Sequence, residues 1–324
     1  MQAYRLILFF GVICFLLHAC NTSQEHKSTQ LLQTNEGIHA AFYNSNGSRI
    51  AMATTQGRLI LCDASLNILN AIQAHQGVTN SSFFSLNDSF IITGGSDRKI
   101  QQWNAQSLSN AFTYPFLLNS HTTVLGNHTM IGCGEAGTVL IYNNNTKDTA
   151  SLTLSKTAAF HVYYNQNDTS VVVSAGDAGY EINILKKEVT HTYASKHGLV
   201  YCIMPDQTNT YVVLGCADSV VRVFNRKTQK LLYQSAKTDG QVYVACYNYK
   251  NNTIAASTSK GSIYFFDTQL KEIKKQLKAF NGCINTIHYH PSDSFIVAGS
   301  LDRTNGGAKL FSTYSYKQLK ELSH

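Results

Sequence analysis

The chain has 324 residues, of which 44% are apolar and only 14% are charged. This composition supplies a large hydrophobic core and excludes both an intrinsically disordered chain and a coiled coil. Because charged residues are scarce, the surface must consist largely of Asn, Gln, Ser, Thr and Tyr, which favours strands and turns over solvated helices.

Residues 1–19 are predicted to be an export signal. Arg5 precedes an uncharged apolar run at residues 6–17. As a helix this run would be about 18 Å long, which is short of the roughly 30 Å hydrocarbon core of a membrane. It therefore favours a signal peptide over a transmembrane anchor.

The end of this segment, Leu17-His18-Ala19-Cys20, resembles the lipobox of bacterial lipoproteins. The resemblance implies that Cys20 becomes the lipid-modified first residue, carrying acyl chains such as palmitate, with residues 20–30 as a polar tether. It implies a cell-envelope location, and Asn21 in place of Asp favours the outer over the inner membrane. The alternative is an ordinary secretory peptide with an incidental cysteine.

Residues 31–324 are predicted to be one repeat domain. The segment from Thr93 to Asn104 reads as a strand, a tight turn and a second strand, and six weaker copies of it follow or precede. Each copy closes on a bulky residue, at positions 62, 103, 142, 184, 224, 266 and 311, so the steps run from 39 to 45 residues. A period of about 40–45 residues with strand patterning is typical of propeller repeats.

The second copy resembles the WD40-repeat family, with Trp103-Asn104 at the place of the family's Trp-Asp. The resemblance implies an all-β fold, a seven-bladed β-propeller of four-stranded antiparallel blades. It also implies a structural hydrogen-bonded tetrad of His75, Thr93, Asp97 and Trp103, rather than a hydrolase triad. His197 and Asp218 recur in the fifth copy, without the tryptophan.

The sequence leaves the closure of the ring open. Either Leu31-Leu32 near the start, or Leu319 and Leu322 near the end, could supply the outermost strand of the seventh blade.

Six cysteines remain after Cys14 and Cys20 are set aside, and we expect them to be buried small apolar residues. A hairpin turn centred near Gln207 would place Cys202 opposite Val212 rather than Cys216. The predicted innermost strands hold His39, His121, His161 and His288, at heights that do not form a ring, so no metal site is predicted.

The predicted innermost strands, residues 38–43, 78–84, 121–125, 159–164, 199–204, 241–247 and 283–289, contain no Asp or Glu. Carboxylate acid–base chemistry would need such groups near the axis. We therefore predict no catalytic residue, no cofactor and no enzyme activity.

Charge is distributed unevenly: residues 20–180 have a net charge of −2 and residues 181–324 of +8. Lys271, Lys274, Lys275 and Lys278 fall in an outer-strand segment, where lysine protects an exposed edge. Lys196, Lys237, Lys260 and Arg303 fall in loops of the wider face, where they could contact an acidic protein or anionic lipid headgroups. Three extra residues within 304–307 add Asn305 to this expected partner-binding face.

The sequence as a whole predicts a monomeric, lipid-tethered propeller that docks a protein partner on its loops. The expected location in the cell envelope argues against a nucleic-acid partner. The alternatives are a structural subunit of an envelope assembly complex and, more remotely, a propeller enzyme acting on an envelope substrate. This functional prediction rests on fold analogy.

Overall fold

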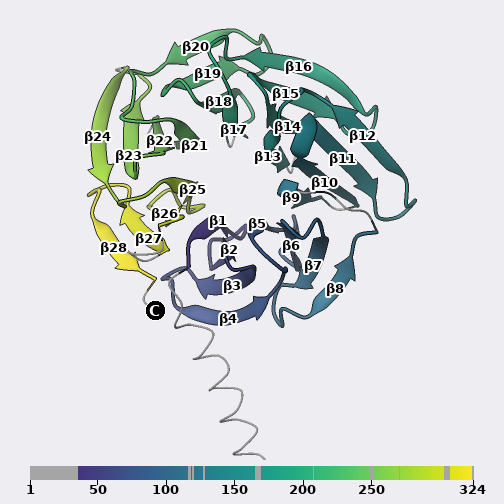
Figure 1. Ribbon diagram of the computed structural model, residues 1–324. Helices are drawn as coiled ribbons and strands as arrows, with labels where there is room; N and C mark the ends of the chain where they lie inside the picture. Colours follow the sequence, from purple (N-terminus) through teal and green to yellow (C-terminus); the bar gives the residue numbers. More distant parts are fainter. Residues whose placement is uncertain are drawn as a thin grey trace, which may run out of the picture. The chain divides into compact units, whose positions relative to one another are not determined.

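The structure is a computed structural model that describes residues 36–322 except 116–117, 119, 127, 165–168, 207, 249–251, 270 and 303–306. The described residues form seven four-stranded antiparallel sheets that surround a common axis as blades (Figure 1). The prediction of an all-β, seven-bladed propeller is confirmed. The compact unit begins at Glu36, and the predicted signal peptide, tether, Cys20 and Leu31-Leu32 lie outside the described residues.

Each blade is built from four consecutive strands, ordered from the axis outwards. The innermost strands are β1 (Ile38–Tyr43), β5 (Thr79–Phe84), β9 (Ser120–Leu125), β13 (Ala159–Tyr164), β17 (Val200–Pro205), β21 (Val242–Asn248) and β25 (Ile284–Tyr289). The second strands are β2 (Arg49–Thr54), β6 (Phe90–Gly95), β10 (Thr129–Gly134), β14 (Ser170–Ala175), β18 (Tyr211–Cys216), β22 (Thr253–Thr258) and β26 (Phe295–Ser300).

The third strands are β3 (Arg58–Asp63), β7 (Ile100–Asn104), β11 (Thr138–Asn143), β15 (Ala178–Asn183), β19 (Val221–Asn225), β23 (Ser262–Asp267) and β27 (Ala308–Ser312). The outermost strands are β4 (Ile68–Gln73), β8 (Asn110–Thr113), β12 (Thr149–Thr153), β16 (Glu188–Ala194), β20 (Leu231–Gln234), β24 (Glu272–Lys278) and β28 (Gln318–Glu321). The only helical segment among the described residues is the 3-10 turn η1 (Glu135–Gly137), and no described helix is long and apolar enough to span a membrane.

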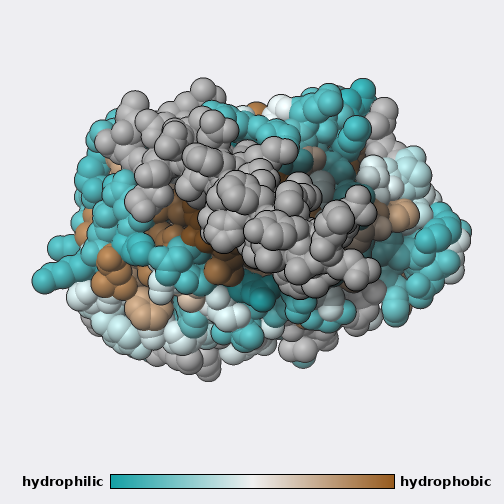
Figure 2. All heavy atoms as spheres, turned by 90° about the horizontal axis from the view of Figure 1, so that it is seen from below, coloured by the Kyte–Doolittle hydropathy of each residue, from teal (hydrophilic) through white to brown (hydrophobic). Residues whose placement is uncertain are grey.

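Burial follows the position of a strand in its blade. Every residue of β14, with the sequence SVVVSA, is buried, because both faces of a middle strand pack against neighbouring blades. The outermost β12 instead alternates between exposed and half-buried residues. In the edge-on view of Figure 2 the described surface is mainly hydrophilic, with separate hydrophobic areas.

A capped turn joins the third and fourth strand of every blade. The last residue of the third strand is Asp, Asn or Ser, and its side chain accepts a backbone N–H two or three residues further on, as Asn104 Oδ1 does from Gln106 at 2.9 Å. The same role falls to Asp63, Asn143, Asn183, Asn225, Asp267 and Ser312. Such side-chain caps fix the turn locally.

These caps correct the repeat alignment in the fourth blade. Asn183 is the capping residue, so Ile182 occupies the position of Trp103, whereas the sequence alignment placed Ile184 there. Ile184 follows β15 and lies in the turn. The error arose because two apolar residues flank Asn183 and only the turn geometry distinguishes them.

The ring closes without exchange of a strand. The outermost strand of the seventh blade is β28, paired with β27, so the C-terminal segment with Leu319 supplies it. Blades seven and one are joined instead by side chains of β25. Thr286 Oγ1 accepts a hydrogen bond from the backbone N–H of Ala41 at 3.2 Å. Asn285 Nδ2 donates to the carbonyl oxygen of His39 at 3.3 Å.

The cysteine register differs from the expectation. Cys202 lies opposite Gly215, and Cys216 opposite Val200, so the predicted pairing of Cys202 with Val212 is wrong. The turn between β17 and β18 is centred further along the chain than Gln207, since these strands end at Pro205 and begin at Tyr211. Five of the six cysteines are buried and Cys283 is half-buried.

Candidate interaction site at the loop face

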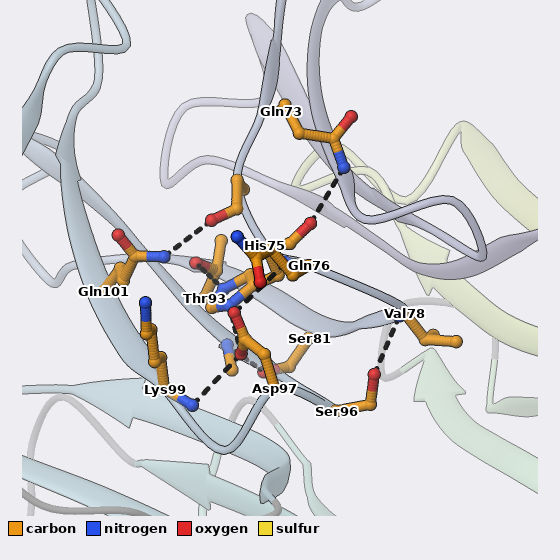
Figure 3. A network of polar contacts seen from close by, with 12 residues as sticks. Gln73, His75, Gln76, Val78, Ser81, Thr93, Ser96, Asp97, Lys99 and Gln101 are labelled. Carbon is orange, nitrogen blue, oxygen red and sulfur yellow. Dashed lines mark hydrogen bonds and ion pairs between the residues drawn. The ribbon is translucent and has the colours of Figure 1, made fainter.

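The tetrad residues of the second blade meet in one hydrogen-bonded chain, of which Figure 3 shows His75, Thr93 and Asp97. Trp103 Nε1 donates to Thr93 Oγ1 at 2.9 Å, and Thr93 Oγ1 lies 2.7 Å from His75 Nε2. His75 Nδ1 lies 2.9 Å from Asp97 Oδ1. The structure thus brings together all four side chains that the sequence singled out, from β6, β7 and the loops beside them.

The direction of this chain follows from the protonation of its members. Burial lowers the pKa of His75, against the opposing effect of Asp97, so the imidazole is neutral near pH 7. Burial raises the pKa of Asp97, but the N–H groups of Lys99 and Gln76 and the contact with His75 outweigh it, and the net shift is downwards. The neutral ring therefore donates from Nδ1 to a carboxylate and accepts the Thr93 hydroxyl proton at Nε2. With every member satisfied, the network is a structural element.

The fifth blade uses its aspartate differently. Asp218 receives two hydrogen bonds from the buried Arg222, at 3.0 and 2.6 Å. His197 is exposed. The aspartate of the fifth blade therefore binds an arginine guanidinium, whereas that of the second blade binds an imidazole.

A β-bulge near the start of each innermost strand defines the axial opening. The pairing with the second strand skips one residue in every blade. We call these seven residues the bulge ring: His39, Asn80, His121, Phe160, Tyr201, Tyr243 and Asn285. Bulges re-aim a side chain relative to the sheet. Apart from His121, whose side chain is outside the described set, all of them line one cavity of about 340 Å³.

The bulge ring has an aromatic half and a polar half. Phe160, Tyr201 and Tyr243 come from adjacent blades and form edge-to-face contacts, with ring centroids 5.3 Å and 5.0 Å apart. Across the axis, Asn285 and His39 lie side by side, with Asn285 Nδ2 at 3.1 Å from His39 Nδ1. No carboxylate is among the described residues that line this cavity.

This cavity opens at the loop face, by which we mean the end of the ring that carries the loops between blades and the turns between second and third strands. Lys196 lies between β16 and β17, Lys237 between β20 and β21, and Lys260 between β22 and β23. All three are exposed. They flank blades five and six, which also supply Tyr201 and Tyr243. Arg303 and Asn305 lie outside the described residues.

A second cavity, of about 370 Å³, opens at the opposite end, which we call the turn face. Phe42 and Phe83 line both cavities, and their tilted rings have centroids 3.9 Å apart, so they separate the two. Burial lowers the pKa of His161 and of His288 to about 4, and for His288 the neighbouring His161 adds to the shift. Both imidazoles are neutral near pH 7.

The histidines of the innermost strands occupy three levels along the axis rather than one. His39 and His121 occupy bulge positions, His161 follows its bulge, and His288 lies nearer the turn face. No group of metal-ligating side chains is found within the part of the chain that the structure describes. The innermost strands match the predicted ranges to within one residue and contain no Asp or Glu.

Strand patterning in the sequence does not predict the bulge ring. Strand patterning assumes strict alternation, and a bulge breaks that alternation by one residue. A usable signal was present, since Phe160, Tyr201 and Tyr243 each follow a small or β-branched buried residue at the start of a strand.

Comparison with known proteins agrees with this architecture. Residues 66–104 and 272–304 match the family described as WD domain, G-beta repeat. Both matched segments start next to or at an outermost strand, β4 or β24, so the sequence repeat is offset by one strand from the blade. Propellers of this family are typically non-catalytic scaffolds.

A relative among curated proteins is autophagy-related protein 16 of Arabidopsis thaliana, which is 22% identical over 256 residues. The match covers 72% of this chain but only 48% of the relative, so the chain spans about half of that protein's length. Two repeats of this chain thus resemble WD40 repeats, and its seven four-stranded blades form a β-propeller.

Proposed function

We propose that this protein is a non-catalytic docking scaffold that binds a protein partner on its loop face. The observation that carries the proposal is the bulge ring, which presents half-buried aromatic and amide side chains in an open cavity on that face. Such a cavity, apolar on one side with a few polar groups on the other, suits the insertion of a partner's side chain. A scaffold role also fits the fold.

The partner is proposed to carry acidic residues around the segment that enters the cavity. Lys196, Lys237 and Lys260 would meet those residues, and complementary charge raises the rate of association and fixes orientation. The described lining of the cavity has no carboxylate that would repel them. Residues 303–306 would border the same site.

The scaffold is further proposed to be tethered to the cell envelope through a lipidated Cys20, which would anchor it in the outer membrane. The support is the apolar run at residues 6–17 followed by Leu17-His18-Ala19-Cys20. Metabolic labelling with a palmitate analogue would test this: Cys20→Ser should abolish labelling, whereas Cys14→Ser should leave a processed, labelled protein. Equal labelling of both variants would refute the anchor.

The docking proposal is tested by site-specific photocrosslinking in intact cells. A photoreactive residue at Tyr201 should yield a defined crosslinked partner, while the same residue at Phe112, an exposed aromatic of β8, should not. Replacing Lys196, Lys237 and Lys260 by Gln should weaken the Tyr201 crosslink. Identical products from both positions would mean that the bulge ring is not the docking site.

A structural subunit of an envelope complex is a second candidate. Leu231 and Leu232 on the outermost strand β20 are 48% and 49% exposed, and a stable neighbour could cover them. A stoichiometric complex that survives gentle detergent extraction, and that is lost with Leu231→Ser/Leu232→Ser, would favour this role over transient docking.

A further inference from the structure

The turns between third and fourth strands carry an uneven distribution of lysine. In blades four to seven these turns hold six exposed lysines, which we call the basic rim: Lys186, Lys187, Lys227, Lys230, Lys271 and Lys317. The corresponding turns of the first three blades hold only Lys147, and Asp148 follows it directly. Because all of these turns lie at the turn face, the basic rim is an arc along the outer edge of that face.

The charge of the basic rim is poorly compensated. The four turns contain no Asp or Glu. Arg226 belongs to one of them, but its guanidinium is buried against Glu181 and adds nothing to the exposed charge. Glu188 and Glu272 begin the strands that follow, and Glu188 lies 3.6 Å from Lys186, so one lysine of the six is paired in this way.

Two large apolar side chains project from the same turns. Leu185 is 77% exposed and Tyr314 is 67% exposed, the highest values among the large apolar side chains of the described residues. Leu185 precedes Lys186 in the turn of blade four, and Tyr314 lies in the turn of blade seven. The arc therefore combines exposed positive charges with single apolar tips at both of its ends.

We propose that the basic rim rests on an anionic lipid surface, with Leu185 and Tyr314 entering the interfacial layer. Lysines near such a surface are attracted by its negative potential, and tyrosine and leucine tolerate the headgroup region. A protein partner fits this surface less well, because the apolar tips are isolated on separate blades and neither axial cavity includes these turns. The loop face, at the other end of the ring, would stay accessible.

This proposal does not depend on the docking role or on the lipid anchor, and its test uses neither. The full chain carrying Cys20→Ser is mixed with phosphatidylglycerol-containing vesicles or with vesicles of phosphatidylcholine alone, and sedimentation measures binding. Binding is expected only to the anionic vesicles. Lys186→Gln/Lys187→Gln/Lys227→Gln/Lys230→Gln should weaken it at least tenfold.

A matched control removes the same charge from the opposite face. Lys156, Lys196, Lys237 and Lys260 are exposed loop-face lysines, and their replacement by Gln should change vesicle affinity less than twofold. Equal losses in both fourfold variants would show that only net charge matters and would overturn the proposal. Unchanged thermal unfolding of each variant confirms that its fold is intact.

Insertion of the apolar tips has its own optical readout. Trp103 is the only tryptophan and is buried in the second blade. In a Leu185→Trp variant, a blue shift on addition of anionic vesicles is therefore expected from position 185. No shift, together with no vesicle binding, would refute the membrane contact. If the rim variant loses binding to polyglutamate but keeps binding to vesicles, the rim is a site for acidic proteins instead.

Discussion

Thr93 connects Trp103 to His75 in the hydrogen-bonded tetrad of the second blade. Its hydroxyl accepts from the Trp103 indole and faces the His75 ring, and its own exposed fraction is zero. In Thr93→Val both neighbours would lose their partner while the volume stays almost unchanged. Two buried polar groups left unsatisfied should lower the free energy of unfolding by about 2–4 kcal/mol.

Chemical denaturation measures this loss. Thr192→Val, at an exposed site of β16, is the matched control and should change stability by no more than about 0.5 kcal/mol. A similar small effect at Thr93 would mean that the tetrad contributes little to this blade.

The axial histidines make stability depend on pH. His161 and His288 have folded-state pKa values of about 4 against a usual 6.5. The unfolded chain therefore binds more protons between these values, and the free energy of unfolding falls as pH drops from about 6.5 to about 4. Each group contributes up to about 1.4 kcal/mol per pH unit in that window.

Urea denaturation from pH 7.5 to 4.5 tests whether the free energy of unfolding falls with pH and whether His161 causes the fall. His161→Asn keeps a donor for the carbonyl of Ile203, which His161 Nδ1 contacts at 3.1 Å, and removes the titrating group. His161→Asn should therefore make the free energy of unfolding depend less on pH, whereas His197→Asn at an exposed site should not. An unaltered slope in His161→Asn would place the acid sensitivity elsewhere.

At the scale of elements, each innermost strand leaves one edge without a strand partner. Side chains of the neighbouring blade satisfy part of that edge: His161 contacts the carbonyl of Ile203, and Cys202 Sγ accepts from the N–H of Ala245 at 3.1 Å. Thr286 does the same for Ala41. Polar residues facing the axis thus serve backbone groups that would otherwise be unpaired.

A buried ion pair links blades four and five. Arg226, in the turn after β19, places Nε and Nη2 at 3.0 Å from the two carboxylate oxygens of Glu181 on β15. Tyr193 Oη donates to Glu181 at 3.0 Å. Arg226→Met should destabilise the protein by about 3–5 kcal/mol, because an uncompensated carboxylate would remain buried.

The double variant Glu181→Leu/Arg226→Met should recover most of that loss. Lys186→Met, which breaks the exposed pair with Glu188, is the control and should cost at most about 1 kcal/mol. If the double variant is no better than Arg226→Met alone, packing rather than charge explains the effect.

The elements were largely predictable because their signals are local. Periodicity gave the innermost strands to within a residue, and the tetrad spacing placed Asp97 in the turn and Trp103 on the second strand of one hairpin. The bulges at Tyr201 and Tyr243, the turn that sets the Cys202 register and the choice of Ile182 over Ile184 were not predictable, since each depends on cross-strand pairing that a single strand does not encode.

At the scale of the whole molecule, the seam between blades seven and one holds the ring together without a shared strand. Besides Asn285 and Thr286, His288 Nδ1 accepts from the N–H of Tyr43 at 3.4 Å. Thr286→Val removes the buried central contact of the three. Hydrogen exchange should then accelerate first in β1 and β25.

The seam between blades four and five, at β13 and β17, provides an internal reference for that measurement. Its exchange rates should stay near those of the unaltered protein. Uniform acceleration around the ring would show that closure is not limited by this seam.

Because every blade is built from one continuous stretch of chain, strand pairing stays within a blade, and packing joins each blade to the next one in the sequence. Only the last seam links segments as far apart as Ala41 and Thr286. The first six blades can therefore pack as an open arc before the seventh closes the ring. In such an arc the outer flanks of blades one and six stay exposed until the final forty or so residues fold between them.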